Sequence, residues 1–433
     1  DEAYRVLQGM NSIDSASPDR ISYGTVMDAY SRCDRPDMAE KVFEEQVASF
    51  RKTGDENLRP GALSMTLLIQ SHSRSSNARK VEKVKIILDR ILELRSEGIL
   101  LQDPDTWTYN IVLACMVSSE KSKDTAARAE AFVNAMKERA RSGDNNARPN
   151  GWTYSELIMM FLDLRDVHKA EQYARESYED PTIDLDIRTV ARFIIAVAQQ
   201  GWAQKADFWL NDLLDRCEKG DGKAPSVTLL GATVSSLYRT AKTKPEALER
   251  IEHLVKRYED LCEAGVLMEG PDNRVYSSVI ASLRIAKTKA PIKVAARALA
   301  ILQKMRNAVV EDKKLARRMM PLTASYRDVL RILVSEERIH VASELLQQMF
   351  DDFRSDPENF PIPDSECVAE VLTGWSNASS PDAWEKANKI FRQIDDATSE
   401  VDTTGRKLLV RDKRCYSAMV ELAKKFSLPN EVA

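Results

Sequence analysis

The chain has 433 residues, of which 43% are hydrophobic and 30% are charged, and its formal net charge is −4. Taken over the whole chain, that balance is not the basic composition typical of a nucleic-acid-binding protein, and no run approaches the 18 apolar residues of a membrane-spanning helix. With 15 glycines and 16 prolines, the chain has few turn residues for an all-β fold, so helices are favoured. The six cysteines are not at metal-ligand spacing, which indicates free thiols in a reducing compartment.

The two ends of the chain look like parts of incomplete helical units. The first residues, DEAYRVLQGM, resemble the second helix of a helix–turn–helix unit, and the last, SLPNEVA, resemble the start of another. We therefore expect a piece of a longer protein, truncated mid-repeat at both ends. A targeting peptide would then lie outside this sequence.

Between these ends the sequence predicts a succession of helix–turn–helix units. The clearest covers residues 104–139, where Trp107, Tyr109 and Val112 fall at helical spacing, a polar turn follows, and a second amphipathic helix completes the unit. Neither helix could bury its apolar stripe alone. The unit therefore needs neighbours of the same kind.

Positions equivalent to Tyr109 recur at intervals of 36 to 50 residues. We call them the anchors of the first helices, and they are Tyr23, Met65, Tyr109, Tyr154, Val190, Leu230, Tyr276, Tyr326, Val368 and Tyr416. Most anchors follow a proline, which fits just before a helix, and a residue that can cap the helix. These prolines are Pro18, Pro60, Pro104, Pro149, Pro225, Pro271, Pro321 and Pro363.

This repetition predicts the fold class. The interval varies because the polar loops between units vary in length, and such insertions are tolerated where each unit contacts only its neighbours. No change in composition divides the series. We therefore predict an all-α fold, a right-handed α-solenoid of about ten helix–turn–helix repeats that spans residues 1–433 as a single domain.

At these residues the chain resembles the pentatricopeptide repeat family. The family pattern opens with Pro-Asp, an apolar residue, Thr, Tyr and Asn, and closes with a helix built on Ala, an apolar pair and Met. The segments PDTWTYNIVLACM, RPNGWTYSELIMMF and SPDRISYGTVMDAYSR match it. The best-matching repeats lie in residues 20–186, and residues 187–433 hold degenerate repeats. The tetratricopeptide repeat differs because its Trp, Leu-Gly and Tyr spacing is absent here.

The resemblance implies binding of single-stranded RNA, one base per repeat. In this family the residue after the anchor and the residue after the next repeat's proline read one base edge. The residue two before the anchor packs between successive bases. Carried over to this sequence, the base-reading pairs are Thr66 with Asp105, Asn110 with Asn150, and Ser155 with Asp186. The base-stacking residues are Leu63, Trp107 and Trp152, although packing between repeats explains the two tryptophans equally well.

The three pairs imply a short recognition sequence. A hydroxyl with a carboxylate suits a purine such as guanine, and the family uses two asparagines for pyrimidines. Three bases are too few for a unique address. Elsewhere the equivalent pairs lack this chemistry: Gly24/Gly61, Ala191/Ser226, Gly231/Asp272, Ser277/Leu322, Arg327/Asp364 and Ala369/Asp412. The first helices nevertheless carry more Lys and Arg than Asp and Glu, which suits contacts with phosphates.

Catalytic chemistry has little support in the sequence. There is no P-loop, GxGxxG, HExxH or CxxC motif. The four histidines, His72, His168, His253 and His340, are far apart, and we expect them to be solvated or to cap helices. We therefore predict no enzyme activity, no cofactor and no metal site.

Two functions remain open. The first is non-catalytic binding of single-stranded RNA in organellar RNA metabolism or translation, and the resemblance implies a mitochondrion or plastid. The second is a structural scaffold subunit of a larger organellar assembly, for example a ribosome-associated one, in which the degenerate repeats contact other proteins. A protein that contacts both RNA and the proteins of a ribonucleoprotein complex would combine them.

Overall fold

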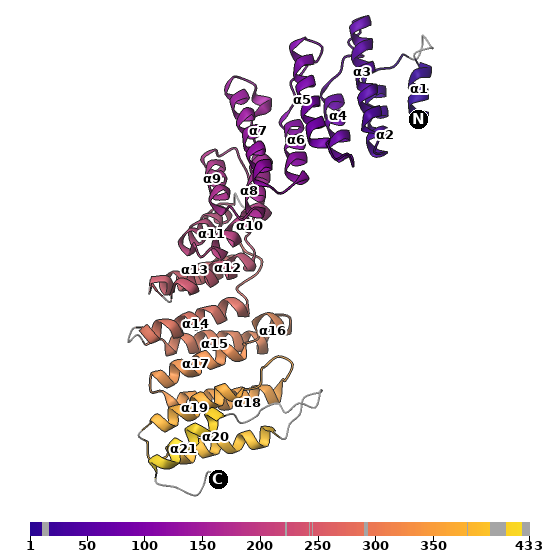
Figure 1. Ribbon diagram of the computed structural model, residues 1–433. Coiled ribbons are helices and arrows are strands. Elements are labelled where there is room, and N and C mark those ends of the chain that lie inside the picture. Colours follow the sequence, from indigo (N-terminus) through magenta and orange to yellow (C-terminus); the bar gives the residue numbers. More distant parts are fainter. Residues whose placement is uncertain are drawn as a thin grey trace. The chain divides into compact units, whose positions relative to one another are not determined.

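The computed structural model describes residues 1–10, 17–220, 223–241, 243–244, 246–289, 293–378, 380–398 and 413–426. All regular secondary structure in these ranges is helical, which confirms the predicted all-α solenoid class (Figure 1). Contacts within the chain group it into two compact units, Asp1–Ala196 and Val197–Ala433. Each unit is described by itself below.

The first unit is a series of antiparallel helix pairs. Its helices are α1 (Glu2–Met10), α2 (Arg20–Arg32), α3 (Pro36–Thr53), α4 (Ala62–Arg74), α5 (Lys80–Ser96), α6 (Thr106–Ser119), α7 (Lys123–Arg141), the short 3₁₀ helix η1 (Asn145–Ala147), α8 (Gly151–Asp163), α9 (Val167–Glu179) and most of α10 (Ile187–Gln199). The first helices α2, α4, α6 and α8 follow one another in contact, and each of α3, α5 and α7 packs against its own first helix and the next.

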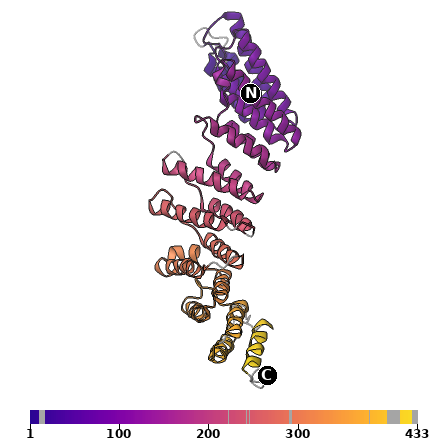
Figure 2. The same ribbon diagram turned by 90° about the vertical axis from the view of Figure 1, so that its left-hand side faces the viewer.

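The second unit repeats this plan. Its helices are α11 (Ala203–Glu218), α12 (Val227–Ala241), α13 (Glu246–Glu263), α14 (Asn273–Lys289), α15 (Ala295–Glu311), α16 (Lys313–Met319), α17 (Thr323–Ser335), α18 (Ile339–Ser355), α19 (Ser365–Asn377), α20 (Ala383–Thr398) and α21 (Lys413–Lys425). The first helices α12, α14, α17, α19 and α21 form the row of contacts here. The turned view in Figure 2 shows the same succession of paired helices.

The predicted anchors form the cores of both units. Nine of the ten are at most 6% exposed, and Tyr416 in α21 is the exception at 44%. Each of the eight prolines predicted to precede a first helix is buried. Asp19, Asp105, Asn150 and Asp364 accept hydrogen bonds from backbone N–H groups in the first turns of α2, α6, α8 and α19, as the capping pattern predicted.

Some features differ from the sequence prediction or lie outside what the structure describes. The helices α16 and η1 were not predicted, and α16 lies in the longest interval between anchors, from Tyr276 to Tyr326. Asp412 and residues 427–433 fall outside the described ranges. The predicted single domain over residues 1–433, with a truncated repeat at each end, stays a prediction. So does the change from well-matching to degenerate repeats after residue 186. Among the described helices, none is both long and apolar enough to cross a membrane.

Candidate nucleic-acid interface

A row of exposed apolar side chains marks the first helices of the first unit. Ile21, Leu63, Trp107 and Trp152 are 64%, 61%, 56% and 39% exposed. Each lies two residues before an anchor, in the first turn of α2, α4, α6 or α8. Single exposed apolar residues are common on proteins, but four at one repeat position on helices in contact indicate a binding surface. Ile21 was not predicted, although its repeat position could have identified it.

The start of this row is hollowed. A pocket of about 240 Å³ lies between Ile21 and Leu63, and Arg20, Pro60 and Gly61 also line it. The residues equivalent to a base-reading pair here are Gly24 and Gly61, which have no side chain to read a base edge. Glu56, Arg59, Ser64 and Gln102 add polar groups to the lining. The pocket therefore offers a flat ring apolar contact at Ile21 and Leu63, with polar groups around it.

The predicted pair Asn110 and Asn150 is brought together. The Asn110 Nδ2 donates a hydrogen bond to the Asn150 Oδ1 at 3.1 Å, and the Thr153 Oγ1 donates one to the Asn110 Oδ1 at 2.7 Å. Asn110 is 2% exposed, so its amide is held between α6 and the start of α8. A base that read Asn110 would have to exchange hydrogen bonds with this cluster.

Thr66 and Asp105 are linked through a third residue. The hydroxyls of Thr66 and Thr108 lie 3.2 Å apart, and the Thr108 hydroxyl donates to the Asp105 Oδ1 at 2.7 Å. Because the Thr108 hydroxyl donates its proton to Asp105, the Thr66 hydroxyl is the donor in its hydrogen bond with Thr108. The Asp105 Oδ1 accepts hydrogen bonds from both the backbone N–H and the hydroxyl of Thr108, and Asp105 is exposed. Its carboxylate keeps acceptor capacity at the surface.

The pair Ser155 and Asp186 is not joined by a hydrogen bond in the described residues. The Ser155 Oγ is buried and has no partner there, and the Asp186 carboxylate accepts instead from the Arg188 Nε at 2.9 Å. A buried hydroxyl without a partner costs about 1–3 kcal/mol. Ser155 is thus a polar group for which a ligand or a water molecule could supply the missing bond.

The sequence prediction missed the residues directly before the anchors. Thr108 and Thr153 are buried, and each bonds the residue that follows the anchor of the preceding repeat. The same contact joins Ser325 to Ser277, whose hydroxyls lie 2.7 Å apart. These hydroxyls hold the residue after the anchor of one repeat against the start of the next repeat. A Ser or Thr directly precedes the anchors Tyr23, Tyr109, Tyr154 and Tyr326, and this was the available signal.

Ion pairs occupy some of the equivalent positions of the second unit, those around α17, α19 and α21. The Arg327 Nη2 lies 2.7 Å from the Asp364 Oδ2, and the Arg327 Nη1 bonds Glu366. Glu366 also accepts from the Arg414 Nη2 at 2.8 Å, and the Arg331 Nε pairs with Glu370 at 2.7 Å. We call Arg327, Arg331, Asp364, Glu366 and Arg414 the arginine–carboxylate network. It joins α17, α19 and α21 through side chains at the repeat positions for which the family resemblance implies contact with a base.

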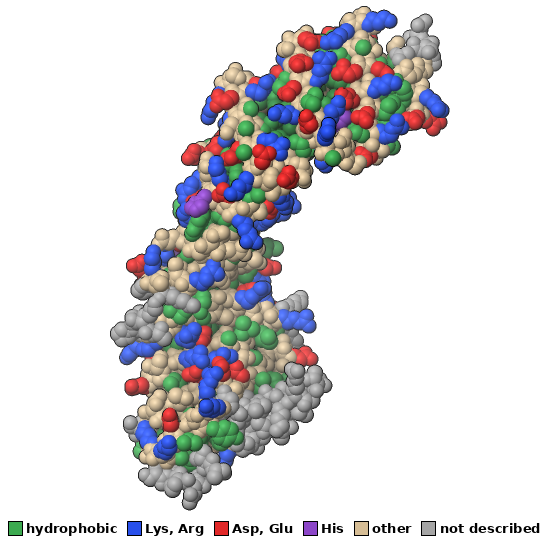
Figure 3. Space-filling view, viewed as in Figure 1, with side chains coloured by type: hydrophobic (Ala, Val, Ile, Leu, Met, Phe, Trp, Pro, Cys, Tyr) green, Lys and Arg blue, Asp and Glu red, His purple; other side chains and the backbone are tan. Residues whose placement is uncertain are grey.

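The electrostatics of the first unit are mixed. Figure 3 shows Lys and Arg interspersed with Asp and Glu on the face of this unit that it presents. Asp163, at the end of α8, pairs with both Lys121 and Arg192, which lower the pKa of its carboxyl. Burial raises the pKa of the Tyr109 anchor to about 12, so the anchors are neutral packing groups. The predicted basic excess of the first helices is therefore partly neutralised by ion pairs.

Comparison with known proteins supports the repeat assignment. A family model of the PPR repeat matches residues 21–45, in α2 and α3. The predicted resemblance to the pentatricopeptide repeat family is confirmed. No curated protein matches the chain.

Solved structures of pentatricopeptide repeat proteins also match the chain. One is the pentatricopeptide repeat protein PPR10 from maize, 16% identical, with a TM-score of 0.37, and the match covers 100% of this chain and 60% of that one. Another is PPR10 in complex with an 18-nt psaJ RNA element, 17% identical, with a TM-score of 0.33 and coverages of 99% and 65%. The chain thus matches less than two thirds of their length. At these TM-scores the argument for a function rests on the side chains described above.

Proposed function

We propose that this chain, which carries a pentatricopeptide repeat, binds single-stranded RNA along the first helices α4, α6 and α8 and catalyses no reaction. The observation that carries the proposal is the row of exposed Ile21, Leu63, Trp107 and Trp152. Aromatic faces stack on any base, and each such contact contributes about 1–3 kcal/mol. One member of each polar pair follows an anchor in α4, α6 or α8, and the other lies just before the next first helix. These side chains would contact base edges.

The polar pairs would give the interface a weak sequence preference. The exposed Asp105 carboxylate can accept the N–H donors of a guanine, with the Thr66 hydroxyl beside it. The Asn110 and Asn150 amides can pair with a pyrimidine edge, and Ser155 with Asp186 would again favour guanine. The proposed preference is therefore guanine, pyrimidine, guanine over three successive repeats. Three bases bias the binding without specifying one transcript.

The proposed setting follows from the family. Pentatricopeptide repeat proteins are commonly organellar, and we place the protein in a mitochondrion or plastid, where it would take part in RNA processing or translation. Its six cysteines form no disulfide, which agrees with a reducing compartment. The second unit would then hold the RNA backbone or another protein of the same ribonucleoprotein complex.

The test measures binding of short fluorescent RNAs by anisotropy at about 100 mM salt, where long-range charge attraction is screened. One RNA carries guanine–uracil–guanine at its centre, and the other carries uracil–guanine–uracil. We expect Trp107→Ala and Trp152→Ala each to weaken binding about tenfold or more, since each removes a stacking face.

The matched control is Phe208→Ala. Phe208 is 56% exposed, like Trp107, but it lies on the second helix α11. It should leave RNA affinity unchanged. An equal loss in all three variants, or no RNA binding by the intact protein, would reject the proposed interface.

The second candidate function is a scaffold subunit of an organellar assembly. The arginine–carboxylate network favours it for the second unit, because these positions are already saturated by bonds within the chain. In a scaffold the network would stiffen the repeats for a protein partner. The two candidates differ in whether RNA affinity responds to changes in the network.

A further inference from the structure

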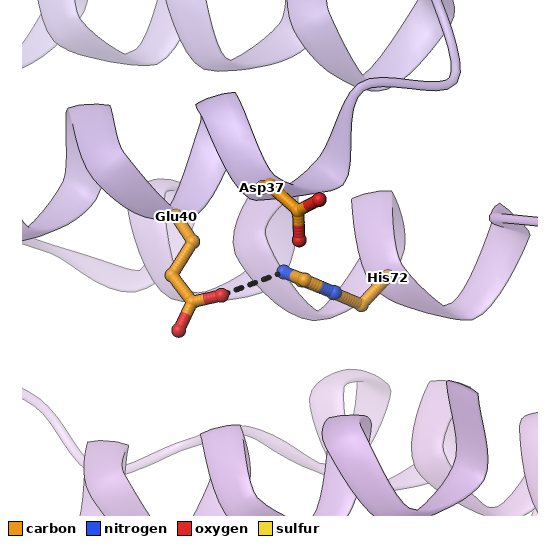
Figure 4. Close-up of side chains that lie close together, drawn as sticks. All are labelled: Asp37, Glu40 and His72. Carbon is orange, nitrogen blue, oxygen red and sulfur yellow. Dashed lines mark ion pairs between the residues drawn. The ribbon is translucent and has the colours of Figure 1, made fainter. Parts of the chain in front are cut away.

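Three side chains with metal-binding groups converge between α3 and α4. Asp37 and Glu40 lie in the first two turns of α3, and His72 lies in the last turn of α4. Figure 4 shows the two carboxylates and the His72 ring pointing toward one another. One ligand atom from each residue lies within 4.8 Å of the other two.

His72 is the unusual member of this cluster. Its side chain is 3% exposed, contrary to the sequence expectation of a solvated or capping histidine. The Nε2 atom points at the carboxylates and lies 3.2 Å from the Glu40 Oε2, yet it makes no hydrogen bond of acceptable geometry in the described residues. A buried polar atom without a partner calls for an explanation such as a missing water or ion.

We propose that His72, Asp37 and Glu40 bind one zinc ion. An imidazole nitrogen and two carboxylate oxygens are ligands that zinc accepts, at about 2.0–2.2 Å in a tetrahedral arrangement with water as the fourth ligand. Ligand atoms at that distance lie about 3.3 Å from one another. The 3.2 Å between the His72 Nε2 and the Glu40 Oε2 fits this spacing, and a rotation of the exposed Asp37 side chain would complete it.

The charges around Glu40 are compatible with the site. Lys83 pairs with the Glu40 Oε1 at 2.9 Å, which leaves Oε2 toward His72. A glutamate beside an ammonium group is ionised at neutral pH. With Asp37, Glu40 leaves a net negative charge beside Lys83 for a cation to balance.

The zinc ion would join two repeats away from the proposed RNA surface. It would tie the start of α3, in the first repeat, to the end of α4, in the second. His72 and Leu63 lie at opposite ends of α4, about 14 Å apart along the helix axis. Zinc would thus stabilise the stack of repeats without covering the exposed apolar row.

The experiment uses the full chain after removal of metals with a chelator, and zinc alone as the titrant. Calorimetry should show one zinc ion per chain, and zinc should raise the melting temperature. Asp37→Asn should lower zinc affinity about tenfold or more and abolish that rise. Because Asp37 is exposed, this variant should keep the melting temperature of the metal-free protein.

His72→Gln should lose zinc binding as well, and Asp37→Asn decides the matter if His72→Gln does not fold. The matched control is Asp124→Asn, which removes an acidic residue from the first turn of the second helix α7 and should bind zinc as the wild type does. Absence of zinc binding by the wild type would overturn the proposal. So would binding that Asp37→Asn retains and that Cys33→Ser, at an exposed thiol, removes.

Discussion

The first helices α4, α6 and α8 and the first helices α17, α19 and α21 use the same repeat positions in opposite ways. In α4 and α6, the residues after the anchors make neutral hydrogen bonds to a hydroxyl of the next repeat, as Thr66 does with Thr108 and Asn110 does with Thr153. In α8, the Ser155 hydroxyl has no partner among the described residues. Among α17, α19 and α21, Arg327 is bound by two carboxylates, Asp364 and Glu366. The two regions differ because the next repeat supplies a hydroxyl in the first case and carboxylates in the second.

This contrast bears on what each region can bind. Neutral hydrogen bonds contribute about 0.5–1.5 kcal/mol net and are exchangeable with those of a ligand. Partly buried ion pairs leave uncompensated charges when one partner is removed, so a ligand gains little by displacing them. The position two residues before the anchor follows the same division, with exposed tryptophans in α6 and α8 but the half-buried Glu366 in α19 and the exposed Arg414 in α21.

The largest expected effect comes from Gly151→Ala, at the start of α8. A Cβ atom there would lie 1.7 Å from the backbone oxygen of Asp184 and 2.6 Å from its carbonyl carbon. The Asp184 backbone cannot rotate away from the new Cβ as a side chain could, so either α8 or the loop before α10 must move. We expect the free energy of unfolding to fall by about 2–3 kcal/mol, measured by urea denaturation, with a loss of RNA affinity because Trp152 is the next residue.

The control for this change lies in the second unit. Gly231 follows an anchor inside α12, and a Cβ there would meet only the Val275 Cγ2, at 3.8 Å. Gly231→Ala should therefore stabilise the protein by up to about 1 kcal/mol, the helix propensity gain of alanine. If both variants destabilise equally, the close approach at Gly151 does not control the start of α8.

A smaller effect is expected from Arg327→Gln, which opens the arginine–carboxylate network. The change leaves Asp364 and Glu366 without their shared guanidinium, although Arg414 still pairs with Glu366. We expect the free energy of unfolding to fall by about 1 kcal/mol, with RNA affinity unchanged. Arg274→Gln is the control, because Arg274 is 85% exposed and pairs with Asp272 on its own helix start.

The RNA affinities of these two variants test whether the arginine–carboxylate network of the second unit contacts RNA. A change in RNA affinity in Arg327→Gln, with none in Arg274→Gln, would mean that the second unit also contacts RNA through its base-reading positions. The contrast between the two regions would then be wrong. Unchanged RNA affinity would mean that the network only stabilises the packing of the repeats. That outcome fits a scaffold role for the second unit or a contact with the RNA backbone elsewhere on it.

The sequence predicted those features that one repeat determines by itself. The anchors, the buried prolines and the capping residues depend on local spacing and backbone chemistry, so a pattern in the sequence is enough to place them. The sequence left open whether Trp107 and Trp152 stack on bases or pack between repeats, and the structure shows both side chains exposed. Their use in stacking stays a prediction.

Features that depend on two repeats were harder to predict. The Arg327 contact with Asp364 and the Thr108 contact with Thr66 join residues about one repeat apart, and the repeat length varies from 36 to 50 residues. His72 is buried because the end of α4 meets the start of α3, which no single-helix pattern shows. The helix α16 forms inside a linker that looked only like a polar insertion.

The smallest expected effect, and the sharpest comparison, comes from two equivalent N-cap residues. Asp105 caps α6 by accepting from the Thr108 N–H at 2.8 Å, and Asp364 caps α19 by accepting from the Cys367 N–H at 2.8 Å. Asparagine caps helices as well as aspartate does, so Asp105→Asn and Asp364→Asn change the charge and keep the cap.

Asp105→Asn should leave the free energy of unfolding unchanged and reduce the preference for the RNA that carries guanine–uracil–guanine by a few-fold, about 1 kcal/mol. An amide supplies one acceptor where the carboxylate supplies two. Asp364→Asn should instead lower stability slightly, because it weakens the pair with Arg327, and leave both RNA affinities alone. Because the two variants make the same chemical change at the same repeat position, opposite outcomes would show that the neighbouring repeat sets the use of that position. Identical outcomes would remove the distinction between the regions.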